Sequence, residues 1–192
     1  MTKTDIEVFY PKNTAEWRNW LMANHDKKQA VWVVFYKKIS EKPTITWSQS
    51  VDEALCFGWI DSKKIAIDHE KSHQFFSKRK PKSTWSKINK DKVAQLISDG
   101  KMALAGLKCI EIAQENGSWN LLDTVDALLV PDDLEEALLS TPNAKTFFEA
   151  QSKSAKKMML YWLVSAKTTE TRSKRINLIT ESCQKGEKPK GI

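Results

Sequence analysis

The sequence contains few of the residues that interrupt or cross-link a chain. Of its 192 residues, 6 are glycine, 6 are proline and 3 are cysteine. Average proteins hold roughly 7% glycine and 5% proline, so this composition favours long regular elements, mostly helices. The cysteines, Cys56, Cys109 and Cys183, are scattered and match no metal-binding spacing, which argues against a disulfide framework and fits a reducing compartment.

Several functional signatures are also missing. No apolar run approaches the roughly 18 residues needed to span a bilayer, and the first residues hold no apolar signal segment. There is no GxGxxG motif and no P-loop. The histidines, His25, His69 and His73, form no HExxH pattern and have no cysteine nearby. We therefore expect a cytoplasmic protein without membrane insertion, and we predict no metal and no cofactor.

The first part of the chain mixes helix and strand patterns. Asn13 predicts the capped start of a helix, and the apolar run 30–36 is typical of a central strand because both of its faces are hydrophobic. Thr46 or Ser50 would cap a short helix that ends near Gly58.

Residues 60–78 then alternate around a turn at 68–72, which predicts a hairpin. Together with the run 30–36, this hairpin would form a small antiparallel sheet packed on helices. Cys56 lies on an apolar helix face, so we interpret it as a buried, inert thiol rather than a nucleophile.

From Trp85 onward the apolar residues recur with the helical period, and we expect Ile97 and Met158 to face inward. The predicted helices are 86 or 89 to 98, 102–116, one capped by Asp132 with Glu135, one with Thr141 as N-cap and Pro142 as first residue, 147–166 and 170–184.

These patterns predict an α+β protein with a small antiparallel sheet and packed helices in the N-terminal half and an all-helical C-terminal half. The acidic stretch 120–133 is the expected boundary, giving domains 1–120 and 121–192. One continuous core is the alternative.

The net charge of +7 is unevenly distributed. Segments 78–92 and 153–175 each contain seven basic residues and one acidic residue, whereas 120–136 contains six acidic residues and no basic one. Such runs are often solvated surface, and the acidic segment could lie beside a basic one. The acidic residues 123–136 could also serve a protein-interaction module, with an unknown protein partner.

The basic segment 78–92 has features of an anion site. It places lysines, one arginine and hydroxyl groups at the start of a helix, where free N–H groups and positive potential favour a phosphate or carboxylate. In the alternative interpretation the hydroxyls cap their own helix, Trp85 lies in the core and the lysines face water. Segment 166–176 repeats the pattern, with Glu170 available to pair with an arginine.

Four stretches carry a family resemblance: EALCFGWIDS, KRKPKSTWSKIN, GKMALAGL and AKTTETRSKRI. Over most of the chain the sequence resembles the YdeI/OmpD-associated family, sometimes labelled bacteriocin-protection proteins. The resemblance implies a link to bacteriocin or cationic-peptide tolerance, a form of stress tolerance, and to an envelope porin. It supplies no established catalytic residues, so we predict none.

The motif residues coincide with the groups that we predict to bind an anion. They are Trp59, Asp61, Arg79, Lys80, Lys82, Ser83, Trp85, Ser86, Asn89, Lys167, Thr171, Arg172 and Arg175. Our leading hypothesis is a non-enzymatic protein whose basic groove binds a small anionic ligand.

A nucleic acid is a second possible partner, with Trp59 and Trp85 stacking on bases. An enzyme that acts on a small phosphate- or carboxylate-bearing substrate is the second hypothesis, with Asp61 as a base if it lies at the floor of a pocket. The sharpest structural prediction is that the hairpin returns residues 79–86 to residues 58–61, with Asp61 facing Arg79.

Overall fold

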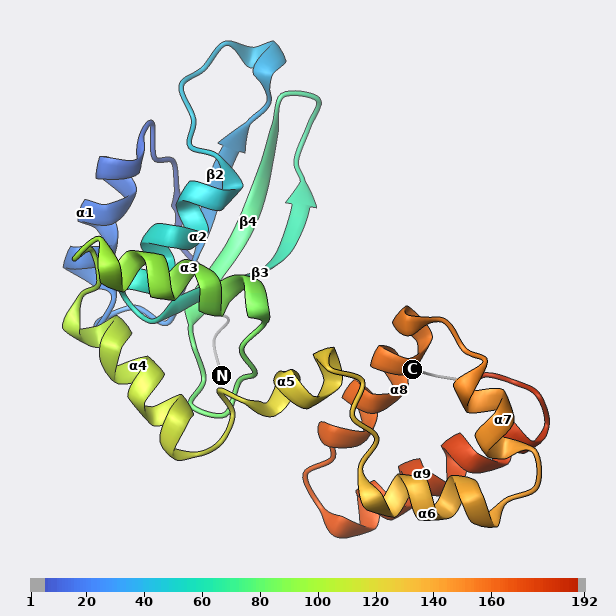
Figure 1. The fold of residues 1–192 in the computed structure, drawn as a ribbon. Coiled ribbons are helices and arrows are strands. Elements are labelled where there is room, and N and C mark those ends of the chain that lie inside the picture. Colours follow the sequence, from blue (N-terminus) through green and yellow to red (C-terminus); the bar gives the residue numbers. More distant parts are fainter. Residues whose placement is uncertain (1–5, 190–192) are drawn as a thin grey trace, which may run out of the picture. The chain divides into compact units, whose positions relative to one another are not determined.

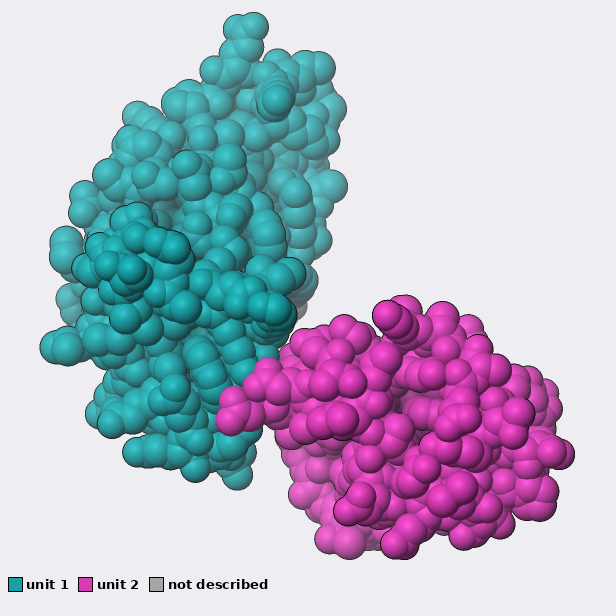
Figure 2. Space-filling model, viewed as in Figure 1, with its two compact units in different colours: residues 1–119 teal, residues 120–192 magenta. Residues whose placement is uncertain are grey.

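The computed structural model describes residues 6–189 and consists of two compact units that divide between Trp119 and Asn120 (Figures 1 and 2). The elements of the first unit are β1 (Val8–Phe9), α1 (Thr14–Asn24), β2 (Ala30–Tyr36), η1 (Lys38–Ser40), α2 (Trp47–Cys56), β3 (Trp59–Ala66), β4 (Lys71–Lys78), α3 (Lys87–Ser98) and α4 (Leu104–Glu115). The second unit holds α5 (Leu121–Asp126), α6 (Asp132–Ser140), α7 (Ala144–Glu149), α8 (Lys153–Val164) and α9 (Thr169–Gln184).

The first unit contains a four-stranded sheet in the order β1-β2-β4-β3. The predicted α+β class is confirmed, and β2 is a central strand as its two apolar faces predict. The sheet is mixed rather than wholly antiparallel, because β1 pairs in parallel with β2, whereas β2–β4 and β3–β4 are antiparallel. The register of β3 against β4 shifts between Asp61 and Lys64, which marks a bulge on an edge strand.

Local capping explains where the helices of the first unit begin. The side chain of Asn13 accepts a hydrogen bond from the backbone N–H of Glu16, and Thr46 forms a reciprocal capping box with Gln49. Ser86 caps α3 in the same way. These bonds satisfy N–H groups that the first turn of a helix leaves free.

One face of the sheet packs on helices to form the core of the first unit. Val31, Val33 and Phe76 contribute the strand side, and Trp17 and Leu55 are among the helical residues that cover it. Ile97 was expected to join them, but it is 49% exposed. The prediction for Ile97 is wrong, because Val93 and Leu96 alone occupy the inward side of α3.

Helix α4 approaches the end of α2 closely. The backbone N–H of Ala103 donates to the carbonyl of Cys56 at 3.1 Å. A Cβ at Gly106 would lie 2.3 Å from the same carbonyl oxygen, so the contact requires glycine. This approach sets α4 against the junction of α2 and β3.

The second unit has its own hydrophobic core, to which α6, α7, α8 and α9 contribute Leu138, Phe148, Leu163 and Ile179. The C-terminal half is helical, as predicted. Among residues 6–189, no helix is both long and apolar enough to cross a membrane.

Two predicted helix starts in this unit are wrong. Asp132 is the first residue of α6 rather than its cap, and no side-chain cap hydrogen bond forms there, because Pro131 occupies the N-cap position. Thr141 ends α6 and donates to the carbonyl of Ala137, while α7 starts after Asn143, which has a positive φ of 63°.

The single helix predicted over 147–166 is also wrong. The helix is interrupted after α7, and a new helix, α8, begins where the Ser152 side chain accepts from the N–H of Ala155. The break rotates the apolar stripe, so Met158 is 46% exposed rather than buried.

Candidate functional site

The hairpin brings together the two segments that the sequence predicts to be adjacent. Trp59 pairs with Lys78, and the backbone N–H of Arg79 donates to the carbonyl of Gly58 at 2.9 Å. Gly58 has a φ of 71°, a conformation that favours glycine, and this turn ends α2 and begins β3. The predicted proximity of residues 58–61 and 79–86 is confirmed at these pairs.

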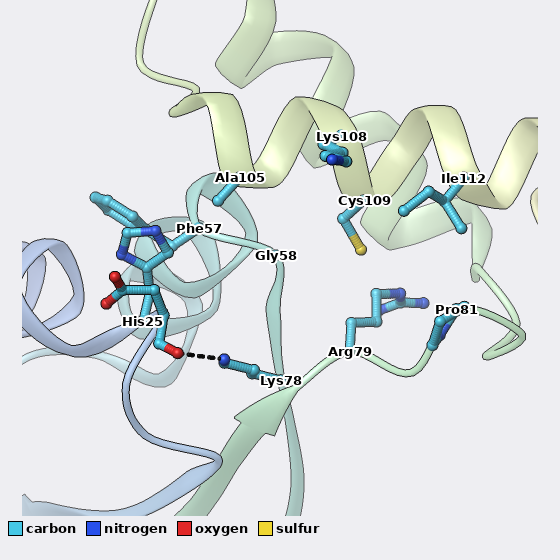
Figure 3. A pocket seen from close by; sticks show the side chains of 11 residues that line it. His25, Phe57, Gly58, Lys78, Arg79, Pro81, Ala105, Lys108, Cys109 and Ile112 are labelled. Atoms are coloured by element: carbon cyan, nitrogen blue, oxygen red, sulfur yellow. Dashed lines mark hydrogen bonds between the residues drawn. The ribbon is translucent and has the colours of Figure 1, made fainter.

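A pocket of about 440 Å³ opens beside this junction (Figure 3). Its walls come from the end of α1, the turn between α2 and β3, the end of β4, and one face of α4. The lining residues are His25, Asp26, Phe57, Gly58, Lys78, Arg79, Pro81, Ala105, Lys108, Cys109 and Ile112.

Arg79 is the buried charge of this pocket. It is 8% exposed, and its guanidinium carbon lies 3.7 Å from the centroid of the Trp85 ring. Nη2 donates to the carbonyl of Thr84, whereas Nε and Nη1 are buried and have no hydrogen-bond partner among residues 6–189. Burial lowers the pKa of Arg79 to about 10, so the guanidinium remains charged at neutral pH.

The other polar groups around the pocket are partly engaged. The ammonium of Lys78 donates to the backbone carbonyl of Asp26 at 2.8 Å, and Lys108 is exposed. Burial raises the pKa of the Cys109 thiol, while the positive charge of Arg79 opposes this shift. The thiol is therefore protonated at neutral pH. Within residues 6–189, no group of three or more His, Cys, Asp or Glu side chains is placed to hold a metal ion.

The predicted pairing of Asp61 with Arg79 is not formed: within residues 6–189 no ion pair joins them, although the charge of Asp61 acts to raise the pKa of Arg79. The carboxylate of Asp61 accepts hydrogen bonds from Trp47 Nε1 at 2.8 Å and from Gln74 Nε2 at 3.2 Å. The reason is the register: Asp61 lies opposite Phe76, three residues before Arg79. Asp61 also does not line the pocket, so the arrangement expected for a catalytic base is absent from this site.

The prediction that Trp59 and Trp85 are available for stacking on bases is also wrong. Trp59 is 0% exposed and Trp85 is 1% exposed. The indole N–H of Trp59 donates to the carbonyl of His25 at 3.3 Å, and the ring centroids of Trp85 and Trp119 are 4.9 Å apart. Both rings are core residues of the first unit.

The remaining residues of the segment 78–92 have local roles. Ser83 donates to the carbonyl of Lys80 at 2.8 Å, and Ser86 accepts from the N–H of Asn89 at 3.3 Å. Lys80 and Lys82 are exposed. These contacts match the interpretation in which the hydroxyls satisfy their own backbone and the lysines face water.

The third motif lies in the second unit and is satisfied there. Arg172 forms a bidentate ion pair with Asp133, at 2.5 and 2.8 Å. Arg175 lies over the Trp162 ring, donating to the Trp162 carbonyl and to Ser165 Oγ.

The other two members of this motif, Thr171 and Lys167, form no salt bridge with any residue that the structure describes. The N–H of Thr171 donates to the capping hydroxyl of Thr168, and Lys167 is exposed. The pocket of the first unit is built without any of these four residues.

Among the lining residues, Arg79 is the one predicted from the sequence to bind an anion. His25, Lys108, Cys109 and Ile112 were missed because they come from α1 and α4, far from the motif in sequence. A usable signal was Gly106 in the stretch GKMALAGL, since a glycine within a helix often marks a close approach of another element.

Two family models match the chain, one on each side of the boundary between the units. The first is described as Domain of unknown function (DUF8412) and matches residues 9–109, more than half of the chain. The chain belongs to this family. The second is described as Bacteriocin-protection, YdeI or OmpD-Associated and matches residues 127–186.

The resemblance to the second family is therefore confirmed, over residues 127–186 rather than over most of the chain. Of the four quoted stretches, AKTTETRSKRI lies in this range, and the other three lie in the range of the first model. Searches of the curated proteins and of the solved structures found no match.

Proposed function

We propose that the first unit binds a small organic anion in the pocket at Arg79. The observation that carries this proposal is the buried guanidinium with two nitrogen atoms that have no hydrogen-bond partner. A buried donor left unpaired costs about 1–3 kcal/mol, and a charged one costs more. A carboxylate or phosphate oxygen that enters beside Cys109 would accept from these groups and remove the cost.

The remaining lining groups define the class of ligand. Phe57, Ala105 and Ile112 offer an apolar surface, and Lys78 and Lys108 add positive charge to that of Arg79, against the one carboxylate of the lining, Asp26. A volume of about 440 Å³ is within the usual range for a small-molecule site. The best-fitting ligand is therefore a small carboxylate or phosphate ester with an apolar or aromatic body.

Calorimetric titration with phenyl phosphate and benzoate tests this proposal, with benzyl alcohol as the neutral analogue. We expect the anions to bind, the alcohol not to bind, and Arg79→Met to weaken anion binding roughly tenfold or more, the loss of one charge-assisted hydrogen bond. Arg172→Met is the matched control, because it removes an arginine of the second unit and leaves the pocket intact. Equal affinity in Arg79→Met and the wild type would contradict the proposal.

We further propose that this binding occurs in the cytoplasm. Cys56, Cys109 and Cys183 are all free thiols, a state that reducing compartments preserve. A part in bacteriocin protection would then be exerted from inside the cell, and it would depend on the second unit, over which that family model matches. Recovery of the protein outside the cytoplasmic fraction would contradict the compartment.

A further inference from the structure

The sheet of the first unit has a second face that the core does not use. Side chains alternate along a strand, so the neighbours of the core residues Val31, Val33 and Phe76 point to the other side. Those neighbours include Trp32 on β2 and Phe75 on β4, which lie opposite each other in the register. Figure 1 shows helices α1 and α2 on one side of the strands.

Aromatic rings gather on this outer face. The Trp32 and Phe75 ring centroids are 4.9 Å apart in an edge-to-face arrangement, and the His73 ring lies 6.4 Å from that of Trp32. All three side chains are half-buried, and none belongs to the core. We call Trp32, His73 and Phe75 the aromatic platform.

Lysines accompany the platform. Lys63 Nζ lies 5.2 Å from the ring centroid of Trp32 and 5.6 Å from that of Phe75. Among residues 6–189, no carboxylate forms a salt bridge with Lys63. Burial, followed by the positive charge of Lys71, lowers the pKa of His73, so the imidazole is a neutral ring at pH 7.

The carboxylates around Lys63 are already engaged. Asp61, two residues before it, accepts hydrogen bonds from Trp47 and Gln74, and the two acidic residues of the turn between β3 and β4 are paired with lysines. Asp68 Oδ2 lies 3.8 Å from Lys71 Nζ, and Glu70 Oε2 lies 3.6 Å from Lys42 Nζ. Lys42 Nζ is also 4.6 Å from the ring centroid of Tyr36, further along the same face of β2. The outer face therefore combines half-buried aromatic rings with Lys63, a lysine that pairs with no carboxylate among the described residues.

We propose that the aromatic platform binds single-stranded nucleic acid, with bases stacked on Trp32 and Phe75 and a phosphate held by Lys63. Aromatic rings on a sheet face supply sequence-tolerant stacking, and lysines beside them supply the attraction to the backbone. A purely apolar partner would leave the Lys63 ammonium unpaired, whereas a phosphate complements it. None of the residues that line the Arg79 pocket belongs to the platform, so this inference is independent of the proposed function.

The test is fluorescence anisotropy of a labelled 12-nucleotide oligothymidine titrated with the full chain at low salt. We expect binding that weakens as salt rises. Trp32→Ala should weaken it roughly tenfold or more, by loss of one stacked base, whereas Trp32→Phe keeps a ring and most of the affinity. Circular dichroism of each variant verifies that the fold is retained.

Neighbouring lysines supply the matched control. Lys63 lies over the platform, whereas Lys64 follows it on β3 and pairs in register with Gln74, whose side chain faces the core side. We expect Lys63→Ala to weaken binding and Lys64→Ala to leave it nearly unchanged. Equal losses in both variants with no effect of Trp32→Ala would mean nonspecific attraction and would overturn the proposal.

Two further outcomes would also overturn it. One is the absence of binding to the oligonucleotide at low salt. The other is a wild-type dimer in sedimentation that Trp32→Ala converts to a monomer, because the platform would then be a contact between copies of the chain.

Discussion

Arg79 in the first unit and Arg172 in the second come from segments with the same excess of basic residues, yet their surroundings are opposite. Arg79 is buried on Trp85, and two of its nitrogen atoms lack a partner. Arg172 is paired with Asp133 through two hydrogen bonds. Burial lowers the pKa of Arg79, and the bond to Asp133 raises that of Arg172. The density of charge therefore does not distinguish the two arginines, whereas their hydrogen-bond partners do.

The largest expected change in stability comes from substitutions in the two cores, and these test whether the two units fold separately. Phe76 and Phe148 are 0% and 1% exposed, each in the core of its own unit. We expect Phe76→Ala and Phe148→Ala to lower the free energy of unfolding by about 3–5 kcal/mol, by loss of burial and formation of a cavity. Hydrogen exchange followed by mass spectrometry should show faster exchange only in the unit that carries the substitution. Equal acceleration in both units would contradict the separation.

The next effect concerns the wall of the pocket. Gly106→Ala should destabilise the first unit by about 1–3 kcal/mol and weaken anion binding, because the new methyl group meets the carbonyl of Cys56 and displaces α4. Leu107→Ala is the control on the same helix, since Leu107 is 40% exposed. Denaturant unfolding and calorimetry measure the two quantities, and wild-type values in Gly106→Ala would rule out this role of the close contact.

Arg79→Met should raise the free energy of unfolding of the ligand-free protein by about 1 kcal/mol. The reason is that burying the charge costs more free energy than the contacts of Arg79 with Thr84 and Trp85 return. The sign follows from the lowered pKa: the folded state holds this proton less tightly than the unfolded chain. The cost is thus present below about pH 10 and is relieved as pH rises above that value. Denaturant unfolding at neutral and mildly alkaline pH should give the same gain, and a loss of stability would show that the arginine is structural.

The smallest expected change in stability is that of Arg172→Met, and its sign is opposite to that of Arg79→Met. Arg172→Met should destabilise the second unit by about 0.5 kcal/mol, because the ion pair is partly exposed and screened by solvent. The bond from Arg172 lowers the pKa of Asp133, so this stabilisation is complete above the unfolded value of about 3.9 and is lost as pH falls through the folded value. Urea unfolding of variant and wild type should therefore converge in acid. A constant difference down to pH 2 would exclude the pairing as its cause.

Three helix starts of the first unit could be predicted from the sequence because they carry local caps. Asn13, Thr46 and Ser86 each bind their own first turn, a signal contained in three or four consecutive residues. In the second unit Asp133 is instead held by Arg172, 39 residues away. The break before α8 depended on Ser152, a cap that the continuous apolar period obscured.

The candidate site was only partly predictable for a related reason. The hairpin rule placed Arg79 beside Gly58, because antiparallel strands return the chain to its starting point. Trp59 and Trp85 are of a residue type that often stacks on bases, but both are buried in the core. Their burial depends on packing with other elements of the first unit, which the sequence does not show. The pocket itself follows from the approach of α4, a contact between segments about 50 residues apart.

The bulge between Asp61 and Lys64 has a consequence for the edge of the sheet. β3 is an outer strand, and an unprotected outer strand is a template on which another chain can add and begin an aggregate. The bulge interrupts the regular spacing of free N–H and C=O groups, and Lys63 and Lys64 place charge where an incoming strand would lie. At the opposite border, β1 is only two residues long. Both borders of the sheet thus carry features that oppose the addition of another strand.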